Sequence, residues 1–420
     1  MPVSAIMQQI TETMNILHTS DWHLGRPLYD KKRYDEFESF LDWLAAFIGR
    51  ECVDVLLVAG DVFDNTTPSN RAQQLYYQFF KKVTVTACRH VIITGGNHDS
   101  PSFLDAPREI LSILNIHVVA AKTENPEDEV IVLKSRNGET EAIVCAVPFL
   151  RDRDIRTAEA GESPDDKARI LARNIAAHYS EVAAIAGNIR GERNIPVIGM
   201  GHLFTREGKT RDGDGVRELY IGTIAHVDGR DISEGFDYMA LGHLHTAQCV
   251  DGAAHVRYCG SPIPMGFGEA GQDKKVVLLR FEGRIPAVEE HSVPCFRALK
   301  RLSGSLDNVC GELLQLKSDG SEAWLEVEIT EAVPAALITA RFDEITAGSG
   351  LEIIRIRNRQ VIDRALHAAD DSETLSMLDD KEVFLRCLEA HEIPEEARAA
   401  LLETYSEAIV SMQTTDVNEK

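Results

Sequence analysis

Residues that commonly bind metal ions follow one apolar run after another along this chain of 420 residues. Short β-branched runs, such as residues 53–59 and 91–94, are separated by longer amphipathic stretches, such as 32–50 and 69–83. Strands that alternate with helices predict an α/β domain, here over about residues 14–290. Because functional groups gather at the carboxyl ends of strands in such sheets, we expect the polar residues after these runs to meet.

The predicted strands become more closely spaced in the second half of this domain. Closer spacing leaves less room for crossover helices, so we expect antiparallel pairs in that half of the sheet. The predicted strands are residues 15–19, 53–59, 91–94, 142–147, 196–200, 237–241, 255–258 and 275–281. The predicted helices are residues 32–50, 69–83, 104–114 and 164–187, the last with Ser163 as its N-cap.

Four motifs occur at predicted strand ends and carry the chemistry. In Asp-x-His and His-x-His, two side chains at i and i+2 point the same way from an extended backbone. Imidazole nitrogen with carboxylate or amide oxygen suits Mn²⁺, Fe²⁺ or Zn²⁺, and the lack of a thiolate disfavours a closed structural zinc site. The motifs are Asp21-Trp22-His23, Gly60-Asp61-Val62-Phe63-Asp64, Gly96-Asn97-His98-Asp99, and Gly201-His202 with Gly242-His243-Leu244-His245.

The number of candidate ligands indicates two metal ions, since seven is too many for one ion. Two divalent ions about 3.5–4 Å apart hydrolyse phosphate esters, because they supply a nucleophile and neutralise charge on both reacting oxygens. Each motif by itself is explained more simply as a turn after a strand. Their joint occurrence, each at a strand end, favours the metal site.

Composition narrows the functions open to the chain. The 44 basic and 67 acidic residues give a net charge of −23, which on its face argues against wrapping a polyanion such as DNA. No run of 18 apolar residues occurs, so we expect no membrane span. Residues 1–13 do not resemble a secretory signal and are interpreted as an N-terminal extension. Eight cysteines without a C-x-x-C pair predict reduced thiols in a cytosolic protein.

The pattern changes after Pro294, where a second unit is predicted. Strands at 296–301, 323–330 and 351–358, with helices near 305–317 and 334–347, indicate a small α+β unit. The polar stretch 369–374 resembles a linker, and two amphipathic helices follow it. The apolar stripe of the second helix packs either on the protein's own core or on a partner helix, and the linker favours the partner. These helices are residues 380–391 and 395–412.

The ordered motifs resemble the calcineurin-like metallophosphoesterase superfamily, and more closely the bacterial SbcD family of nuclease subunits. The resemblance runs from about Met14 to the C-terminal helices and is strongest before residue 270. It implies a layered αββα sandwich with mixed sheets, a small α+β capping domain and a C-terminal helical hairpin. The segments that carry it are residues 16–25, 58–64, 96–100, 240–245 and 257–264.

The same resemblance implies a role for each candidate site residue. Asp61 bridges two divalent ions, preferably Mn²⁺ with Mg²⁺ as a possible substitute. His98 assists the leaving oxygen or orients the phosphate, and Asp99 is expected to orient the His98 imidazole. The ligands are Asp21, His23 and His245 for one ion, and Asn97, His202 and His243 for the other.

The resemblance further implies a DNA nuclease that acts on duplex ends, single strands and hairpins, in the cytoplasm at the nucleoid. Its partner is an SbcC-type ATPase, in a heterotetramer held by the C-terminal hairpin. The expected division is an extension (1–13), a nuclease domain (14–294), a capping domain (295–365), a linker (366–378) and the docking hairpin (379–420).

Three alternatives to a DNA nuclease have to be weighed. A calcineurin-like phosphodiesterase for small nucleotides would share the motifs but has no need of the residues after Pro294. A Ser/Thr phosphatase is disfavoured, because Asp64 is followed by Asn65 rather than Arg and His98 by Asp99 rather than Glu. A metal-binding scaffold without chemistry is also disfavoured, because every ligand position and His98 are filled.

Residues beside the motifs have simpler expected roles. Asp64 is expected to support the turn or a ligand, and Trp22 and Phe63 to wall the site, with base stacking left open. His18, His90 and His117 lie in or beside strands and are expected to be packed or hydrogen-bonded rather than ligating. The acidic segment 122–141 is expected to form a solvated hairpin.

Overall fold

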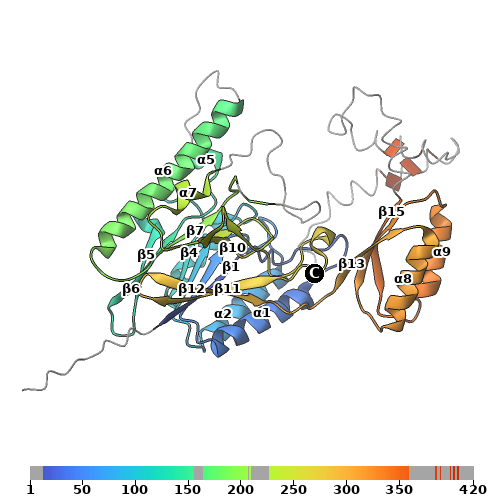
Figure 1. Cartoon of the computed structure of the whole chain (residues 1–420), viewed down its shortest axis with the longest axis horizontal. Helices are drawn as coiled ribbons and strands as arrows, with labels where there is room; N and C mark the ends of the chain where they lie inside the picture. Colours follow the sequence, from blue (N-terminus) through green and yellow to red (C-terminus); the bar gives the residue numbers. More distant parts are fainter. Residues whose placement is uncertain are drawn as a thin grey trace, which may run out of the picture. The chain divides into compact units, whose positions relative to one another are not determined.

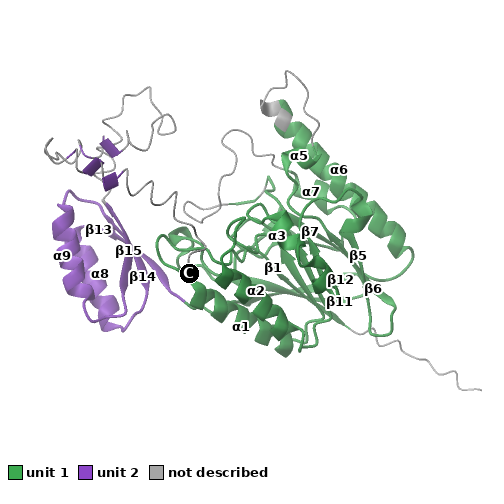
Figure 2. Ribbon diagram, turned by 180° about the vertical axis from the view of Figure 1, so that it is seen from behind, with its two compact units in different colours: residues 1–296 green, residues 297–420 purple. Residues whose placement is uncertain are grey.

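The structure is a computed structural model that describes residues 13–155, 164–206, 208–209 and 227–358, together with a few residues between 384 and 405. The chain divides into two compact units, residues 1–296 and residues 297–420 (Figure 2). In the described part of the chain, no helix combines the length and the apolar character needed to cross a membrane.

The first sheet of unit 1 contains the strands that lead into the first three motifs. Strands β1 to β4 run parallel, β11 pairs antiparallel with β1, and β12 pairs antiparallel with β11 at one edge. The order is β12-β11-β1-β2-β3-β4. The bounds are β1 (Met14–Thr19), β2 (Val55–Ala59), β3 (His90–Thr94), β4 (Ile116–Val119), β11 (Lys275–Glu282) and β12 (Ile285–Ser292).

The second sheet contains the strands that lead into the fourth motif. Strands β6, β7, β8 and β10 run parallel, and β5 and β9 pair antiparallel at its two edges. The order is β5-β6-β7-β8-β10-β9. The bounds are β5 (Val130–Lys134), β6 (Thr140–Ala146), β7 (Val197–His202), β8 (Tyr238–Gly242), β9 (Gln248–Val250) and β10 (Ala253–Tyr258).

Helices cover the outer faces of the two sheets, which gives the expected αββα layering (Figure 1). Helices α1 (Tyr34–Arg50) and α2 (Asn70–Val83) bury their apolar faces against the first sheet, and the long α6 (Pro164–Arg190) packs on the second. A third apolar cluster, which includes Ile16 and Met200, fills the space between the sheets. The fold class predicted from the sequence is therefore confirmed.

Some elements differ from the prediction for identifiable reasons. The helix predicted over 104–114 is instead two short helices, α3 (Pro101–Asp105) and α4 (Arg108–Ser112), because Pro107 interrupts the helical hydrogen bonds between them. Strands β4, β5, β9 and β12 were not predicted. Strands β5 and β12 lie at sheet edges and are half-exposed, so their sequences lack a continuous apolar run. The predicted N-cap Ser163 lies outside the described residues.

Unit 2 contains a three-stranded parallel sheet with two helices that share one apolar cluster with it. Helices α8 and α9 connect its strands in the order βαβαβ, at the places predicted from the sequence. The predicted linker lies outside the described residues, and of the predicted hairpin Phe384 and Tyr405 stack with ring centroids 4.1 Å apart. The elements are β13 (Leu299–Gly304), α8 (Leu306–Ser318), β14 (Trp324–Ile329), α9 (Ala335–Thr346) and β15 (Glu352–Asn358).

Candidate metal centre

The loops after β1 and β2 hold their motifs in an unusual backbone conformation. The Asp21 amide donates to Gly60 O at 3.0 Å, and the His23 amide donates to Asp61 O at 2.9 Å. Asp21, His23 and Asp61 have φ values of 53°, 46° and 50°, a left-handed conformation that costs a non-glycine residue roughly 1–2 kcal/mol. Such strain persists where the surroundings fix it and is common at functional sites.

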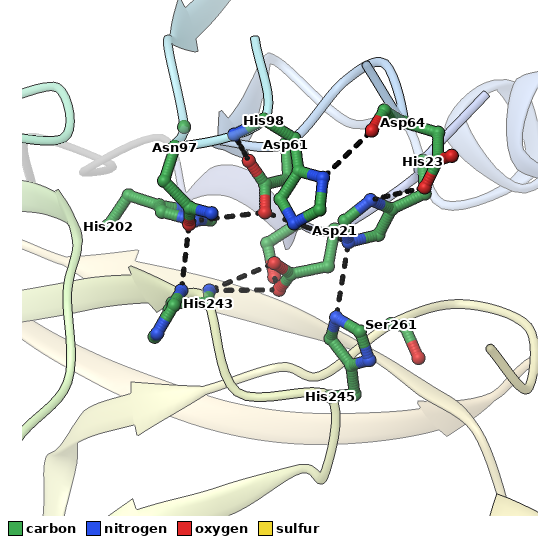
Figure 3. Close-up of polar contacts among 12 residues, drawn as sticks. Asp21, His23, Asp61, Asp64, Asn97, His98, His202, His243, His245 and Ser261 are labelled. Carbon is green, nitrogen blue, oxygen red and sulfur yellow. Dashed lines mark hydrogen bonds and ion pairs between the residues drawn. The ribbon is translucent and has the colours of Figure 1, made fainter. Parts of the chain in front are cut away.

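The first group of side chains consists of Asp21, His23 and His245, all fully or almost fully buried. One ligand-type atom from each lies within 4.8 Å of the others. The two imidazoles face each other, with His23 Nε2 3.1 Å from His245 Nε2 (Figure 3). The Asp21 carboxylate also accepts the His243 amide at 2.9 Å, and this bond fixes the loop after β8.

The second group consists of Asn97, His202 and His243. The Asn97 Oδ1 atom lies 3.0 Å from His202 Nε2 and 2.9 Å from His243 Nδ1. His202 Nδ1 donates to the Ala59 carbonyl at 2.9 Å, so its Nε2 atom faces the group. The close approach of β2 to His202 requires Gly60, since a Cβ there would lie 2.1 Å from His202 Nδ1.

Asp61 lies between the two groups. Its Oδ2 atom is 3.2 Å from His202 Nε2 in the second group and 3.6 Å from His23 Nε2 in the first. Its Oδ1 atom accepts the backbone amide of His98 at 2.9 Å. The Oδ2 atom therefore faces both groups, so the Asp61 carboxylate could contribute to an ion in either one.

The electrostatics of the two groups suit a divalent cation. Burial lowers the pKa of both His23 and His243 to about 3, so these imidazoles are neutral and their lone pairs are available. Burial alone would also lower the pKa of His202, but the Asp61 carboxylate raises it to about 9. A metal ion bound there would displace a proton, as metal binding to imidazole generally does.

The donor set fits the predicted cofactor. The side chains offer imidazole nitrogen, carboxylate oxygen and one amide oxygen, with no thiolate, which suits borderline divalent ions. All seven ligand candidates from the sequence meet at one edge of unit 1. Asn97 and His243 are half-buried, so the second group is the more open to solvent.

His98 lies beside the two groups. Its ring is perpendicular to that of His23, with centroids 4.8 Å apart, and its side chain is almost buried. Its Nδ1 atom lies 2.8 Å from the backbone carbonyl of Asp64, which accepts a hydrogen bond only. The Nδ1 atom therefore carries the proton and Nε2 the lone pair, and a ring nitrogen of His98 lies within 4.8 Å of ligand-type atoms of His23 and Asp61.

The expectation that Asp99 orients His98 is wrong. The Asp99 carboxylate instead accepts the backbone amides of Gly96, Val62 and Phe63 at 2.9–3.1 Å. These bonds fasten the loop after β3 to the loop after β2. Burial, with the neighbouring charge of Asp61, raises the pKa of Asp99 to about 7.

The neighbours of the motifs also have defined roles. Trp22 and Phe63 are 0% and 1% exposed, and Trp22 packs edge-on against Phe40 and Phe79, so the open possibility of base stacking is excluded. Asp64 lies 3.6 Å from His23 Nδ1, which agrees with its expected support of a ligand. His18 is buried with Nδ1 3.1 Å from Tyr238 Oη, away from the two groups.

The remaining predictions concern residues far from the centre. His90 and His117 stack on one another on β3 and β4 rather than joining either group. The acidic segment forms the β5–β6 hairpin, but it is not solvated throughout. Glu129 is fully buried there, with its Oε2 atom 2.7 Å from Nε2 of the almost buried His178.

Sequence reasoning missed the residues behind His245. Its Nδ1 atom lies 3.2 Å from Oε1 of Glu269, which also forms a buried ion pair with Lys274 and accepts from Ser261. These residues are 16 to 29 positions away from His245. They form no short motif, so only the fold reveals the contact.

Comparison with known proteins agrees with this geometry. A family model described as calcineurin-like phosphoesterase matches residues 14–247, and one described as type 5 capsule protein repressor C-terminal domain matches residues 295–392. The D subunit of nuclease SbcCD from Escherichia coli (strain K12) is 39% identical over 92% of this chain and 96% of its own length. The proteins of the same name from Rhodobacter capsulatus and Bacillus subtilis are 34% and 27% identical, over 77% and 76% of this chain and 84% and 80% of their own lengths. The chain thus belongs to the calcineurin-like phosphoesterase family and, within it, to the D subunits of SbcCD nucleases.

Proposed function

We propose that this chain is a two-metal nuclease subunit that hydrolyses phosphodiester bonds in DNA. The observation that carries the proposal is the convergence of two three-residue groups on Asp61, with His98 beside them. Relatives named nuclease subunits align over 92% and 77% of this chain, which supports a nucleic-acid substrate over a small nucleotide. We further propose Mn²⁺ as the preferred ion, as the resemblance to the SbcD family implies, and the mixed nitrogen and oxygen donor set is compatible with it.

In this proposal the chain's own residues do the following work. Asp21, His23 and His245 would hold one ion, Asn97, His202 and His243 would hold the other, and Asp61 would contribute to both. Bound divalent ions supply Lewis-acid polarisation of the phosphate and a nucleophile at neutral pH. His98 presents Nε2 toward the substrate, since Nδ1 donates to the Asp64 carbonyl. Asp99 acts on the loops rather than on His98.

Cleavage of a labelled hairpin DNA by the purified chain with Mn²⁺ tests the proposal. The wild type is expected to cut, and His98→Ala is expected to lose about 10²–10⁴-fold in kcat, the usual range for a lost general acid or base. Mn²⁺ affinity should be unchanged in this variant, because His98 is not proposed as a ligand.

The exposed His255 provides a matched control for this experiment. His255→Gln should cut the hairpin at the wild-type rate. Full activity in His98→Ala would contradict the role given to His98. Equal activity with EDTA would contradict the metal mechanism altogether.

We propose that the subunit acts with an SbcC-type ATPase, in a heterotetramer of two copies of each, in the cytoplasm at the nucleoid. The name shared by the relatives, which is that of one subunit of SbcCD, supports a partner. The division into nuclease domain (14–294), capping domain (295–365), linker (366–378) and docking hairpin (379–420) belongs to the same proposal. The amphipathic pattern of residues 395–412 supports docking there.

Deletion of residues 375–420 tests the docking hairpin. The truncated chain is expected to lose co-purification with the ATPase and to keep its basal cleavage with Mn²⁺, because the metal centre lies wholly in unit 1. The mass of the complex by light scattering measures the stoichiometry. Stoichiometric binding by the truncated chain would refute the docking assignment.

A further inference from the structure

A buried network of charged and polar side chains lies directly behind His245. Glu269 is 0% exposed and Lys274 is 6% exposed, and the two form an ion pair. The Glu269 Oε1 atom faces His245 Nδ1 at 3.2 Å, while Oε2 accepts from Lys274 and, at 3.1 Å, from Ser261 Oγ. Both carboxylate oxygens are therefore used.

Lys274 also holds the backbone of the metal-binding loop. Its Nζ donates to the His245 carbonyl at 3.0 Å and to Ser261 Oγ at 3.0 Å. The Ser261 amide donates to the same His245 carbonyl at 3.2 Å. A Cβ at Gly260 would lie 2.7 Å from that carbonyl, and its φ of +79° suits glycine. The segment thus contacts both the ring and the main chain of His245.

This arrangement fixes the orientation and tautomer of the His245 ring. An ionised carboxylate accepts hydrogen bonds but cannot donate, so His245 Nδ1 must carry the proton in its bond to Glu269. The Nε2 lone pair then points away from Glu269, toward His23 Nε2 at 3.1 Å. A carboxylate behind a metal-binding histidine orients the ring and raises its basicity.

The second group of ligands has a different kind of support. His202 Nδ1 donates to the neutral backbone carbonyl of Ala59 at 2.9 Å, and among the described residues no carboxylate pairs with this atom. We propose that Glu269, held by Lys274 and Ser261, is a positioning residue that sets the metal affinity of the first group selectively. The inference rests on the proposed function, because it presupposes that the two groups hold two ions.

Mn²⁺ titration of the full chain by calorimetry tests the inference. The wild type is expected to take up two ions. In Glu269→Gln, one class of site should weaken about 10–100-fold, the range for loss of a histidine's outer partner, while the other class keeps its affinity. At a Mn²⁺ concentration that fills only the stronger class of site in Glu269→Gln, electron paramagnetic resonance should show an isolated ion in this variant. The wild type should show a coupled pair of ions.

Glu129 offers a matched control, because it too is a fully buried carboxylate bonded to a histidine, at 2.7 Å. Glu129→Gln should leave both Mn²⁺ affinities within about twofold of wild type. Ser261→Ala removes one bond to Glu269 but leaves the ion pair, so it should weaken the same class by a smaller factor. This variant keeps the test valid if Glu269→Gln does not fold.

The outcomes separate the inference from the proposed function. Unchanged affinities in folded Glu269→Gln or Ser261→Ala would overturn the inference alone. Equal weakening of both classes, or the same weakening in Glu129→Gln, would also overturn it, because the effect would then be general. A wild type that takes up fewer than two ions would overturn the two-metal function itself.

Discussion

The two sheets of unit 1 contribute different chemistry to the same edge. The loops of the first sheet supply every carboxylate and the amide of the proposed ligands, together with His23. The second sheet supplies only imidazoles, from the end of β7 and the loop after β8. Neither sheet alone assembles either group, since each group combines residues of both. The centre therefore depends on the packing of one sheet on the other.

Backbone strain is also distributed unequally between the two sheets. In the first sheet Asp21, His23 and Asp61 have positive φ, whereas only His243 (φ 96°) does so among the proposed ligands of the second. The strained residues are those whose amides or carbonyls connect the loops after β1 and β2. The first sheet thus contributes rigid turns that place carboxylates, and the second contributes imidazoles that complete the groups.

The largest effect is expected where one side chain contacts both groups. Asp61→Asn should weaken both classes of Mn²⁺ site, because Asp61 lies 3.2 Å from His202 and 3.6 Å from His23. Loss of a ligand's hydrogen-bond partner lowers metal affinity by up to about 100-fold. We expect Asp61→Asn to lower both Mn²⁺ affinities by more than that, and hairpin cleavage to fall at least as far. Calorimetry and a cleavage assay measure the two effects.

Asp64→Asn is the matched control, since Asp64 contacts His23 but not the second group. It should weaken one class of site by at most about 100-fold and leave the other unchanged. If Asp61→Asn also affected only one class, the view that Asp61 connects the two groups would have to be abandoned.

The arrangement of the two sheets explains which strands and ligands could be predicted from the sequence. The ends of β1, β2, β3, β7 and β8 are visible as apolar runs followed by polar motifs, and parallel strands bring such ends to one edge. The convergence of all seven proposed ligands was therefore predictable. Edge strands such as β5 and β12 were not, because one face of each is exposed and their apolar pattern is broken.

Partners of the ligands were less predictable. Asp99 follows His98 directly, yet its carboxylate accepts hydrogen bonds from three backbone amides. The backbone carbonyl of Asp64 accepts the hydrogen bond from His98 that Asp99 was expected to accept. A backbone carbonyl has no signature in the sequence. Glu269, at the end of the 3₁₀ turn η2 (Phe267–Glu269), lies 24 positions from His245 in the chain, so their contact has no local pattern.

A smaller effect is expected where the loop after β2 approaches His202 of the second sheet. Gly60→Ala places a Cβ 2.1 Å from His202 Nδ1 at a φ of +82°. The left-handed backbone and the overlap together should lower the free energy of unfolding by about 2–5 kcal/mol. Because His202 must move, the class of Mn²⁺ site that contains it should weaken as well. Urea unfolding and calorimetry measure both.

Gly252→Ala separates backbone strain from overlap, since Gly252 has a φ of +72° and no atom lies within 4 Å of the place that a Cβ would take. It should cost only about 1–2 kcal/mol and leave both Mn²⁺ affinities intact. Equal metal binding in the two alanine variants would argue that His202 does not depend on close contact with the first sheet.

The smallest effect is expected from His18, which joins the two sheets away from the metal centre. His18 on β1 contacts Tyr238 on β8, and burial lowers the pKa of His18 from 6.5 to about 3. Below pH 6.5 the unfolded chain therefore binds a proton that the folded chain excludes. As the pH drops below 6.5, this residue thus lowers the free energy of unfolding. The slope is about 1.4 kcal/mol per pH unit until the pH approaches the folded-state value.

Urea unfolding of the metal-free chain at pH 7 and pH 5 measures this contribution. Between pH 7 and pH 5, the free energy of unfolding should drop by about 2 kcal/mol less in His18→Gln than in the wild type, because glutamine does not titrate. The other buried histidines contribute equally to both proteins and cancel in the difference. The exposed His255 is the control, and His255→Gln should retain the wild-type slope. If His18→Gln kept the wild-type pH dependence of the free energy of unfolding, His18 would bind the proton in the folded chain as well. The two sheets would then be packed less tightly at His18 than at the metal centre.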